Sequence, residues 1–201
     1  MSSIDGVSRA KRLQLIESRL ADVIISPNLY TVVEIFSLTY PGKAFALFRH
    51  PMDTAISMYK SNSISSSISM EQFFEDGSLV DDNWMTRQLS NKLEGPLNEF
   101  DLKRAKETIR RKFIVGLVDQ ATESVKRFKE YFGWTSTQFS QPQVNTCMAK
   151  VTQLKVSMDK IEENSRLWNL VMRHNQYDMP LFLYVQRLFV EQSNSLPSPE
   201  L

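Results

Sequence analysis

The chain has 201 residues, of which 42% are hydrophobic and 23% charged, a composition typical of a globular domain with a sizeable core. Its formal net charge of +1 gives no overall attraction to nucleic acid or anionic lipid, and no apolar run approaches the roughly 18 residues that span a bilayer. A single cysteine, Cys147, excludes an internal disulfide, and His50 and His174 lack the spacing of metal ligands, so we expect no metal.

The first segment predicts a helix, a strand and a second helix. Val7–Leu20 has the amphipathic spacing of a helix, so we treat residues 1–20 as a separate N-terminal element. These residues lack the apolar core of a signal peptide. The apolar run Ala21–Ile25 predicts a buried strand, and Ser26-Pro27 predicts the start of a helix that continues through Phe36.

The stretch Lys43–Lys60 carries the most informative pattern. Ala44–Phe48 predicts a buried strand of a parallel sheet, Pro51 ends it, and a helical pattern follows. A strand that turns tightly into a helix leaves free N–H groups and the positive end of the helix dipole at the turn. The guanidinium of Arg49 and the hydroxyl of Ser57 suit a phosphate there. The alternative is that Arg49 is a surface charge and Ser57 an ordinary helix residue.

Two patterns follow this helix. The serine-rich run Ser61–Ser69 predicts a flexible loop, and a capping box at Ser69–Gln72 predicts a short helix that ends at Gly77. The segment Asn83–Ser90 has the apolar spacing of a helix, with Arg87 on a different face. Isolated arginines usually form surface salt bridges, which is one interpretation of Arg87. The other is a ligand role for Arg87, with Lys92 as a weaker candidate, and it rests on a resemblance to a known family.

The second half of the chain predicts a further strand between helices. Leu102–Arg111 predicts a helix, Phe113–Leu117 an apolar strand, and Gln120–Tyr131 an amphipathic helix. Two helices close the chain, and we expect Asp178 to cap the second of them. Residues 193–201 predict a disordered tail. The order of strands and helices indicates an α/β domain with a parallel sheet.

Three runs carry a resemblance to a known family. Arg49-His50-Pro51, followed by Asp53, Ser57 and Tyr59, resembles the strand–turn–helix that binds the 3′-phosphate in sulfotransferases. These enzymes use 3′-phosphoadenosine 5′-phosphosulfate (PAPS). The run from Val115-Gly116-Leu117 to Gly133-Trp134 and the pattern from Asn175 to Gln192 are similar to those of Golgi-type carbohydrate sulfotransferases.

The resemblance covers residues 21–192 and implies a three-layer, P-loop-NTPase-like sulfotransferase fold that is helix-rich with a short parallel sheet. It implies that Arg49 and Ser57 bind the 3′-phosphate of PAPS or of the product 3′,5′-ADP, and that Arg87 lies near the nucleotide. It also implies a Golgi compartment, behind a membrane helix that this sequence does not contain.

The sequence departs from the family at its start. The family holds the 5′-phosphosulfate with a strand–loop–helix that carries a Lys or Arg, and Met1–Ile25 contains no such pattern. We therefore expect an N-terminally truncated sheet with an exposed edge or an apolar groove. The family's catalytic base, a His or Glu ahead of the 3′-phosphate strand, is not assigned, because Glu17 and Glu34 match no motif.

Three functions remain open. The first is transfer of a sulfuryl group from PAPS to a hydroxyl of a carbohydrate, with the nucleotide and a glycan acceptor as partners. The second is a truncated or inactive remnant of that fold. The third is a helix-rich protein-interaction module in which Arg49 serves only structure. A P-loop kinase fits the sequence poorly because GxxxxGK[ST] does not occur.

Overall fold

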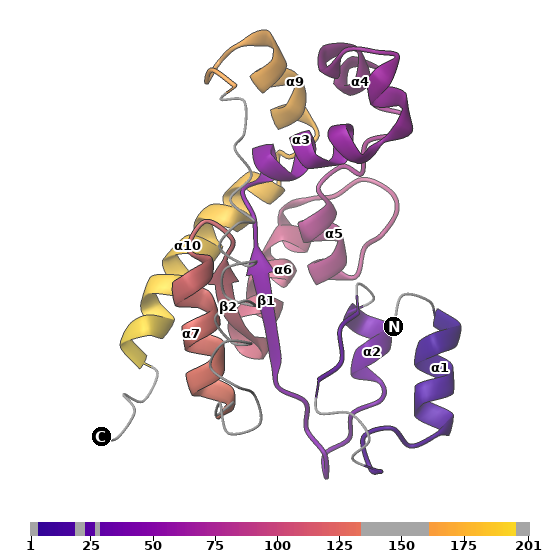
Figure 1. Cartoon of the computed structure of the whole chain (residues 1–201), viewed down its shortest axis with the longest axis vertical. Coiled ribbons are helices and arrows are strands. Elements are labelled where there is room, and N and C mark those ends of the chain that lie inside the picture. The colour runs from indigo at the N-terminus through magenta and orange to yellow at the C-terminus, as the bar shows by residue number, and fades with distance from the viewer. Residues whose placement is uncertain (1–3, 19–22, 27–28, 134–160, 196–201) are drawn as a thin grey trace, which may run out of the picture.

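The computed structural model describes residues 4–18, 23–26, 29–133 and 161–195 (Figure 1). Cys147 lies outside them. The described helices and strands are, in chain order, α1 (Ile4–Arg12), α2 (Leu29–Val33), β1 (Ala44–Phe48), α3 (Pro51–Ser61), the 3₁₀ helix η1 (Ser63–Ser66), α4 (Met70–Asp76), α5 (Trp84–Ser90), α6 (Glu99–Lys112), β2 (Phe113–Leu117), α7 (Ala121–Phe132), α9 (Arg166–Arg173) and α10 (Asp178–Ser195).

A short parallel sheet forms the centre of the molecule. Strands β1 and β2 pair from Ala44 opposite Phe113 to Phe48 opposite Leu117. Helix α7 covers one face, where the ring of Phe45 lies 4.9 Å from that of Phe128. Helices α5, α6 and α10 pack on the other face (Figure 1). The predicted helix-rich α/β organisation with a short parallel sheet is confirmed, whereas the sulfotransferase fold remains a prediction.

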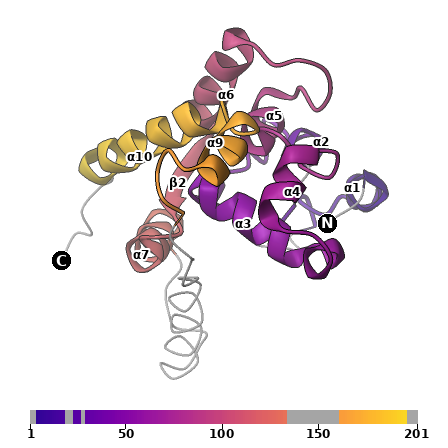
Figure 2. The ribbon, with the colours of Figure 1, turned by 90° about the horizontal axis from the view of Figure 1, so that it is seen from above.

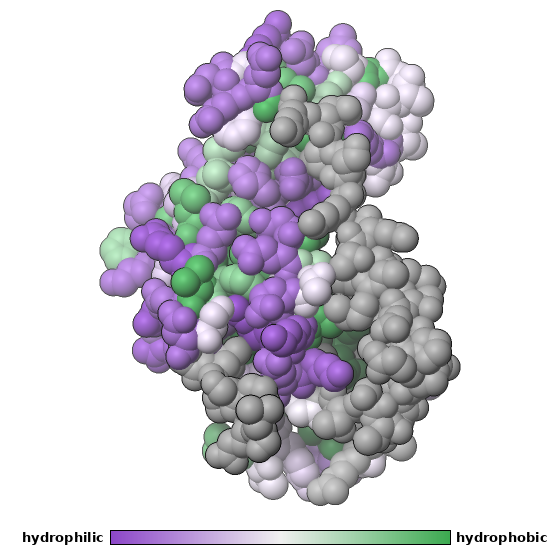
Figure 3. Space-filling view, turned by 60° about the vertical axis from the view of Figure 1, so that its left-hand side comes forward, coloured by the Kyte–Doolittle hydropathy of each residue, from purple (hydrophilic) through white to green (hydrophobic). Residues whose placement is uncertain are grey.

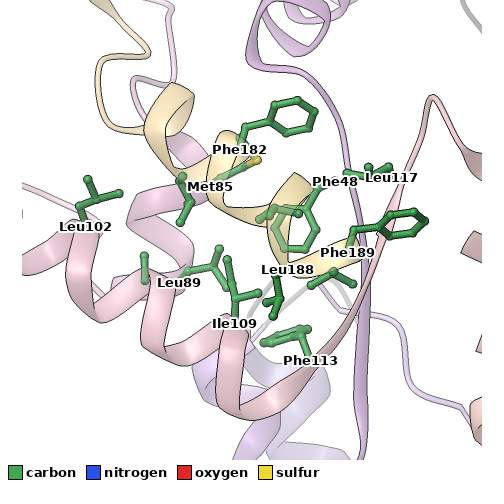
Figure 4. Close-up of a cluster of buried hydrophobic side chains, with 14 residues drawn as sticks. Phe48, Met85, Leu89, Leu102, Ile109, Phe113, Leu117, Phe182, Leu188 and Phe189 are labelled. Carbon is green, nitrogen blue, oxygen red and sulfur yellow. The ribbon is translucent and has the colours of Figure 1, made fainter. Parts of the chain in front are cut away.

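The main hydrophobic core lies between the sheet and helices α5, α6 and α10 (Figure 4). Phe48 and Leu117 enter it from the carboxyl ends of the two strands. Full burial of one such side chain stabilises the fold by about 1.5–3 kcal/mol. The other core residues are Met85, Leu89, Leu102, Ala105, Ile109, Phe113, Val115, Leu181, Phe182, Val185, Leu188 and Phe189. This core fixes the position of the strand ends from which the candidate site is built.

A second core joins α3 to α4 and α9, which lie beside one another in both ribbon views (Figures 1 and 2). Phe73 and Phe74 are fully buried in it, and their rings meet edge to face at 5.1 Å. The predicted capping box of α4 is confirmed, because Gln72 N–H donates to Ser69 Oγ and Ser69 N–H donates to Gln72 Oε1. Gly77, with a φ of 69°, ends this helix as expected.

Side chains close the outer edge of β2. The amide of Gln192 accepts from Val115 N–H at 2.9 Å and donates to Phe113 C=O at 2.8 Å, as a neighbouring strand would. Ser124 Oγ accepts from Leu117 N–H at 2.8 Å. Arg127 donates to Val115 C=O at 3.4 Å, and its guanidinium lies 3.6 Å from the ring centre of Phe189. This edge therefore offers no open ladder to another strand.

The N-terminal predictions are partly wrong. The segment 23–26 is not a strand, because it forms no ladder with β1 or β2. Helix α1 ends at Arg12 instead of Leu20, and turns follow in which Gln14 takes a φ of 49°. Helix α2 ends at Val33. Tighter turns follow it, in which Phe36 N–H donates to Val33 C=O.

Two other expectations are corrected. The serine-rich run contains the 3₁₀ helix η1, whose first turn is capped by Asn62 Oδ1. Helix α10 continues to Ser195, which is three residues into the segment expected to be a tail. Contacts of Gln192 and Ser193 with β2 and α7 explain this extension, because they give the last turns of the helix a packed surface.

On the face shown in Figure 3, hydrophobic residues form separate areas among hydrophilic ones.

Candidate functional site at the turn between β1 and α3

The predicted strand–turn–helix is present. Strand β1 ends at Phe48, Arg49 and His50 form the connection, and α3 begins at Pro51. His50 has an extended backbone with a ψ of 133°, because a residue before proline avoids helical angles. The N-terminus of α3 therefore lies directly at the carboxyl end of the sheet (Figure 1). Open α/β sheets bind ligands at this end of their strands.

His50 serves as the N-cap of α3. Its Nδ1 accepts a hydrogen bond from Met52 N–H at 3.1 Å, which requires that this nitrogen carry no proton. Its ring meets Phe182 edge to face at 5.2 Å. Burial lowers the pKa of His50, and the carboxylates of Asp53 and Asp119 act in the opposite direction. The neutral imidazole is therefore the form that fits this turn.

Arg49 and Ser57 lie on either side of the start of α3. Arg49 is half-buried and directly follows β1, and Ser57 is half-buried in the second turn of α3. The charges at this end of the sheet are mixed, because Asp53 in the first turn of α3 and Asp119 after β2 both act on the same histidine. An anion bound here would be attracted by Arg49 and the dipole of α3 and repelled by the two carboxylates.

Arg87 has a different environment. Its guanidinium forms a two-pronged ion pair with Asp82, with Nη2 2.8 Å from Oδ2 and Nε 3.1 Å from Oδ1. Its Nη1 donates to the carbonyl oxygens of Lys92 and Gly95. Burial would raise the pKa of Asp82, but hydrogen bonds from Arg87 and Asn83 hold it below its ordinary value. Arg87 thus holds the chain on both sides of α5 together.

The weaker candidates also have structural partners. Lys92 donates to Asp101 at 3.0 Å, next to the N-terminus of α6. Glu34 lies 3.7 Å from Lys11 in an exposed ion pair near α1 and α2. Glu17 lies in the turns that follow α1. The structure brings none of these three together with Arg49 in the part of the chain that it describes, so the catalytic base remains unassigned.

A cavity among the described residues lies away from this turn. It is a groove of about 920 Å³ between α2, the segment 23–26 and the sheet, and neither Arg49 nor Ser57 lines it. The expected groove beside the sheet is therefore present. The sequence analysis did not identify Lys43 and Lys112, which line this groove. A single lysine before a strand belongs to no motif that would indicate a binding role.

Comparison with protein-family models, with curated proteins and with solved structures finds no match to this chain. Among the described residues, no helix has the length and apolarity that crossing a membrane requires. Within the same residues, His, Cys, Asp and Glu side chains form no group of three that could hold a metal ion.

Proposed function

We propose that this chain is a sulfotransferase-like protein that binds the 3′-phosphate of PAPS or 3′,5′-ADP at the turn between β1 and α3. The observation that supports it is the strand–turn–helix itself, with Arg49 directly after the strand and Ser57 in the helix. The motif through which the sequence resembles sulfotransferases thus has the local structure that such a phosphate site needs.

Each part of this turn has a role in the proposed site. The guanidinium of Arg49 presents parallel N–H donors to two phosphate oxygens, and Ser57 offers a hydroxyl. The N-terminus of α3 adds the positive end of its dipole. Met52 N–H already donates a hydrogen bond to His50, so it is not available to a phosphate. The carboxylates of Asp53 and Asp119 repel a phosphate dianion. We therefore expect this half of a nucleotide site to bind weakly.

The wider proposal is transfer of a sulfuryl group from PAPS to a carbohydrate hydroxyl in the Golgi lumen. Such transfer needs a second cationic site that stabilises the charge developing on the 5′-phosphate. The described residues before β1 form α1, α2 and the turns around them, and a strand–loop–helix is not among them. Binding of the 3′-phosphate is accordingly the step to test first.

The test is a titration of 3′,5′-ADP into the purified chain, followed by thermal unfolding. A ligand that binds only the folded state at 100 times its Kd stabilises it by about 2.7 kcal/mol. We expect 3′,5′-ADP to raise Tm and 5′-AMP, which lacks the 3′-phosphate, to raise it much less. Arg49→Ala and Ser57→Ala should each reduce the shift.

Two matched controls remove the same chemical groups at exposed positions. Ser61→Ala removes an exposed hydroxyl from the end of α3, and Arg187→Ala removes an exposed guanidinium from α10. Both should leave the shift unchanged. Equal shifts with 3′,5′-ADP and 5′-AMP would contradict recognition of the 3′-phosphate at this turn. No shift at millimolar 3′,5′-ADP would contradict nucleotide binding and favour an interaction module in which Arg49 serves only structure.

A further inference from the structure

The groove between the N-terminal segments and the sheet is separate from the proposed nucleotide site. Its volume of about 920 Å³ falls in the range of roughly 300–1,000 Å³ that small-molecule sites occupy. Helix α2 and the segment 23–26 line one side, and β1, the start of β2 and the end of α7 line the other.

The walls of this groove are mainly aliphatic and aromatic. Its apolar lining includes Ile24, Leu29, Val32, Val33, Phe36 and Phe132. Ile25 and Val33 leave 80% and 41% of their surface exposed, although both line the groove. An apolar ligand would remove this surface from water, which is favourable in proportion to the area covered.

Two lysines line the groove, each directly before one of the two strands. Lys43 directly precedes Ala44 and Lys112 directly precedes Phe113, and these two strand residues face each other in the parallel ladder. Neighbouring strands lie roughly 4.8 Å apart, so the two lysines start from adjacent positions. Like charges at facing positions repel, and an anion between them relieves that repulsion.

The other two cations of the groove are already paired. Arg110 lies 3.3 Å from Glu191, and Arg111 pairs with Glu107. In the part of the chain that is described, no ion pair joins Lys43 or Lys112 to a carboxylate. The ammonium group of Lys43 lies 5.1 Å from the centre of the Tyr131 ring, which holds it at the groove.

We propose that this groove binds an amphipathic anion with a linear alkyl chain, such as a fatty carboxylate. The head group lies between Lys43 and Lys112, and the chain lies against α2 and the segment 23–26. Among the described residues, the uncharged polar side chains of the lining are Ser26, Tyr131 and Gln192, so most of the wall contacts an alkyl chain better than a polar one. The Gln192 amide is already bonded to β2.

Calorimetric titration with octanoate and decanoate, below the concentrations at which they form micelles, tests both parts of the site. Each added CH₂ that enters an apolar groove should tighten binding about fourfold, which corresponds to about 0.8 kcal/mol. Decanoate should therefore bind about 15-fold more tightly than octanoate. Decyltrimethylammonium, with the same chain and the opposite charge, should bind at least tenfold more weakly than decanoate.

Variants separate the head-group site from the chain site. The double variant Lys43→Glu, Lys112→Glu should lower the affinity for decanoate at least tenfold. Lys103→Glu, at an exposed position of α6 outside the groove, should change this affinity less than twofold. Val33→Asp places a charge on the apolar wall and should also lower the affinity for decanoate. Equal binding of decanoate and decyltrimethylammonium, an equal effect of Lys103→Glu, or no binding of decanoate to the wild-type chain overturns the proposal.

Discussion

Asn83 and Asp178 cap each other's helices. Asn83, the residue before α5, accepts through Oδ1 from the N–H groups of Tyr177 at 2.7 Å and Asp178 at 3.3 Å, at the start of α10. Asp178, the first residue of α10, accepts from the N–H groups of Met85 at 2.9 Å and Thr86 at 2.8 Å, at the start of α5. The expectation that Asp178 caps its own helix is therefore wrong. Its carboxylate serves a helix more than ninety positions earlier.

Replacing Asp178 with Ala should lower the free energy of unfolding by about 2–4 kcal/mol. The change leaves two buried N–H groups and the Thr86 hydroxyl, which donates to Asp178 at 2.7 Å, without an acceptor. Urea unfolding measures the loss. The control is Asp81→Ala, an exposed carboxylate near the start of α5, which should change stability by less than about 0.5 kcal/mol. Equal effects of the two variants would contradict the capping role.

Replacing Gln192 with Ala should open the outer edge of β2. The side-chain amide is the partner of Val115 N–H and Phe113 C=O, so its loss should cost about 1–3 kcal/mol. Amide hydrogen exchange gives the residue-level readout, because Val115 should exchange faster relative to global unfolding. Glu191→Ala removes the neighbouring exposed side chain, whose ion pair with Arg110 adds little, and should leave Val115 protected. Unchanged exchange at Val115 in Gln192→Ala would exclude this contact.

Local patterns in the sequence predict local structure well here. The strand–turn–helix around Arg49 follows from an apolar run, a proline and a helical period. The start of α4 follows from Ser69 and Gln72, which need only each other. Strand β2 follows from its apolar run between two amphipathic helices, and the parallel pairing from their order.

Partners far apart in the sequence could not be predicted in this way. An apolar run such as 23–26 becomes a strand only if another strand completes its ladder, and here it lines a groove instead. A salt bridge is one of the two interpretations that the sequence allows for Arg87, but the sequence does not specify Asp82 as the partner. The Gln192 contact with β2 depends on how α10 lies across the sheet, which no local period specifies.

Arg87 should contribute to stability through its fork of donors. Arg87→Ala should cost about 2 kcal/mol, since the side chain is 15% exposed and binds both Asp82 and two carbonyl groups. Arg87→Lys should recover little of this, because an ammonium group cannot span the same acceptors. Urea unfolding measures both. If Arg87→Lys keeps wild-type stability but abolishes the Tm shift with 3′,5′-ADP, the arginine is a nucleotide ligand, as the family resemblance implies.

His50 should make stability depend on pH. Because burial lowers its pKa below the ordinary value of 6.5, the unfolded chain takes up a proton at a pH where the folded chain does not. The free energy of unfolding should therefore fall as pH decreases below about 6.5, until the folded histidine is protonated as well. Protonation of Nδ1 also removes the acceptor of Met52 N–H.

His50→Asn tests this dependence, because asparagine keeps a side-chain acceptor at the N-cap of α3 but does not titrate. Urea midpoints measured between pH 5 and pH 8 should vary less in this variant than in the wild type. His174→Asn is the matched control for the second histidine, whose Nε2 lies 2.9 Å from Phe74 C=O. If the pH dependence persists unchanged in His50→Asn, the turn after β1 is not its source.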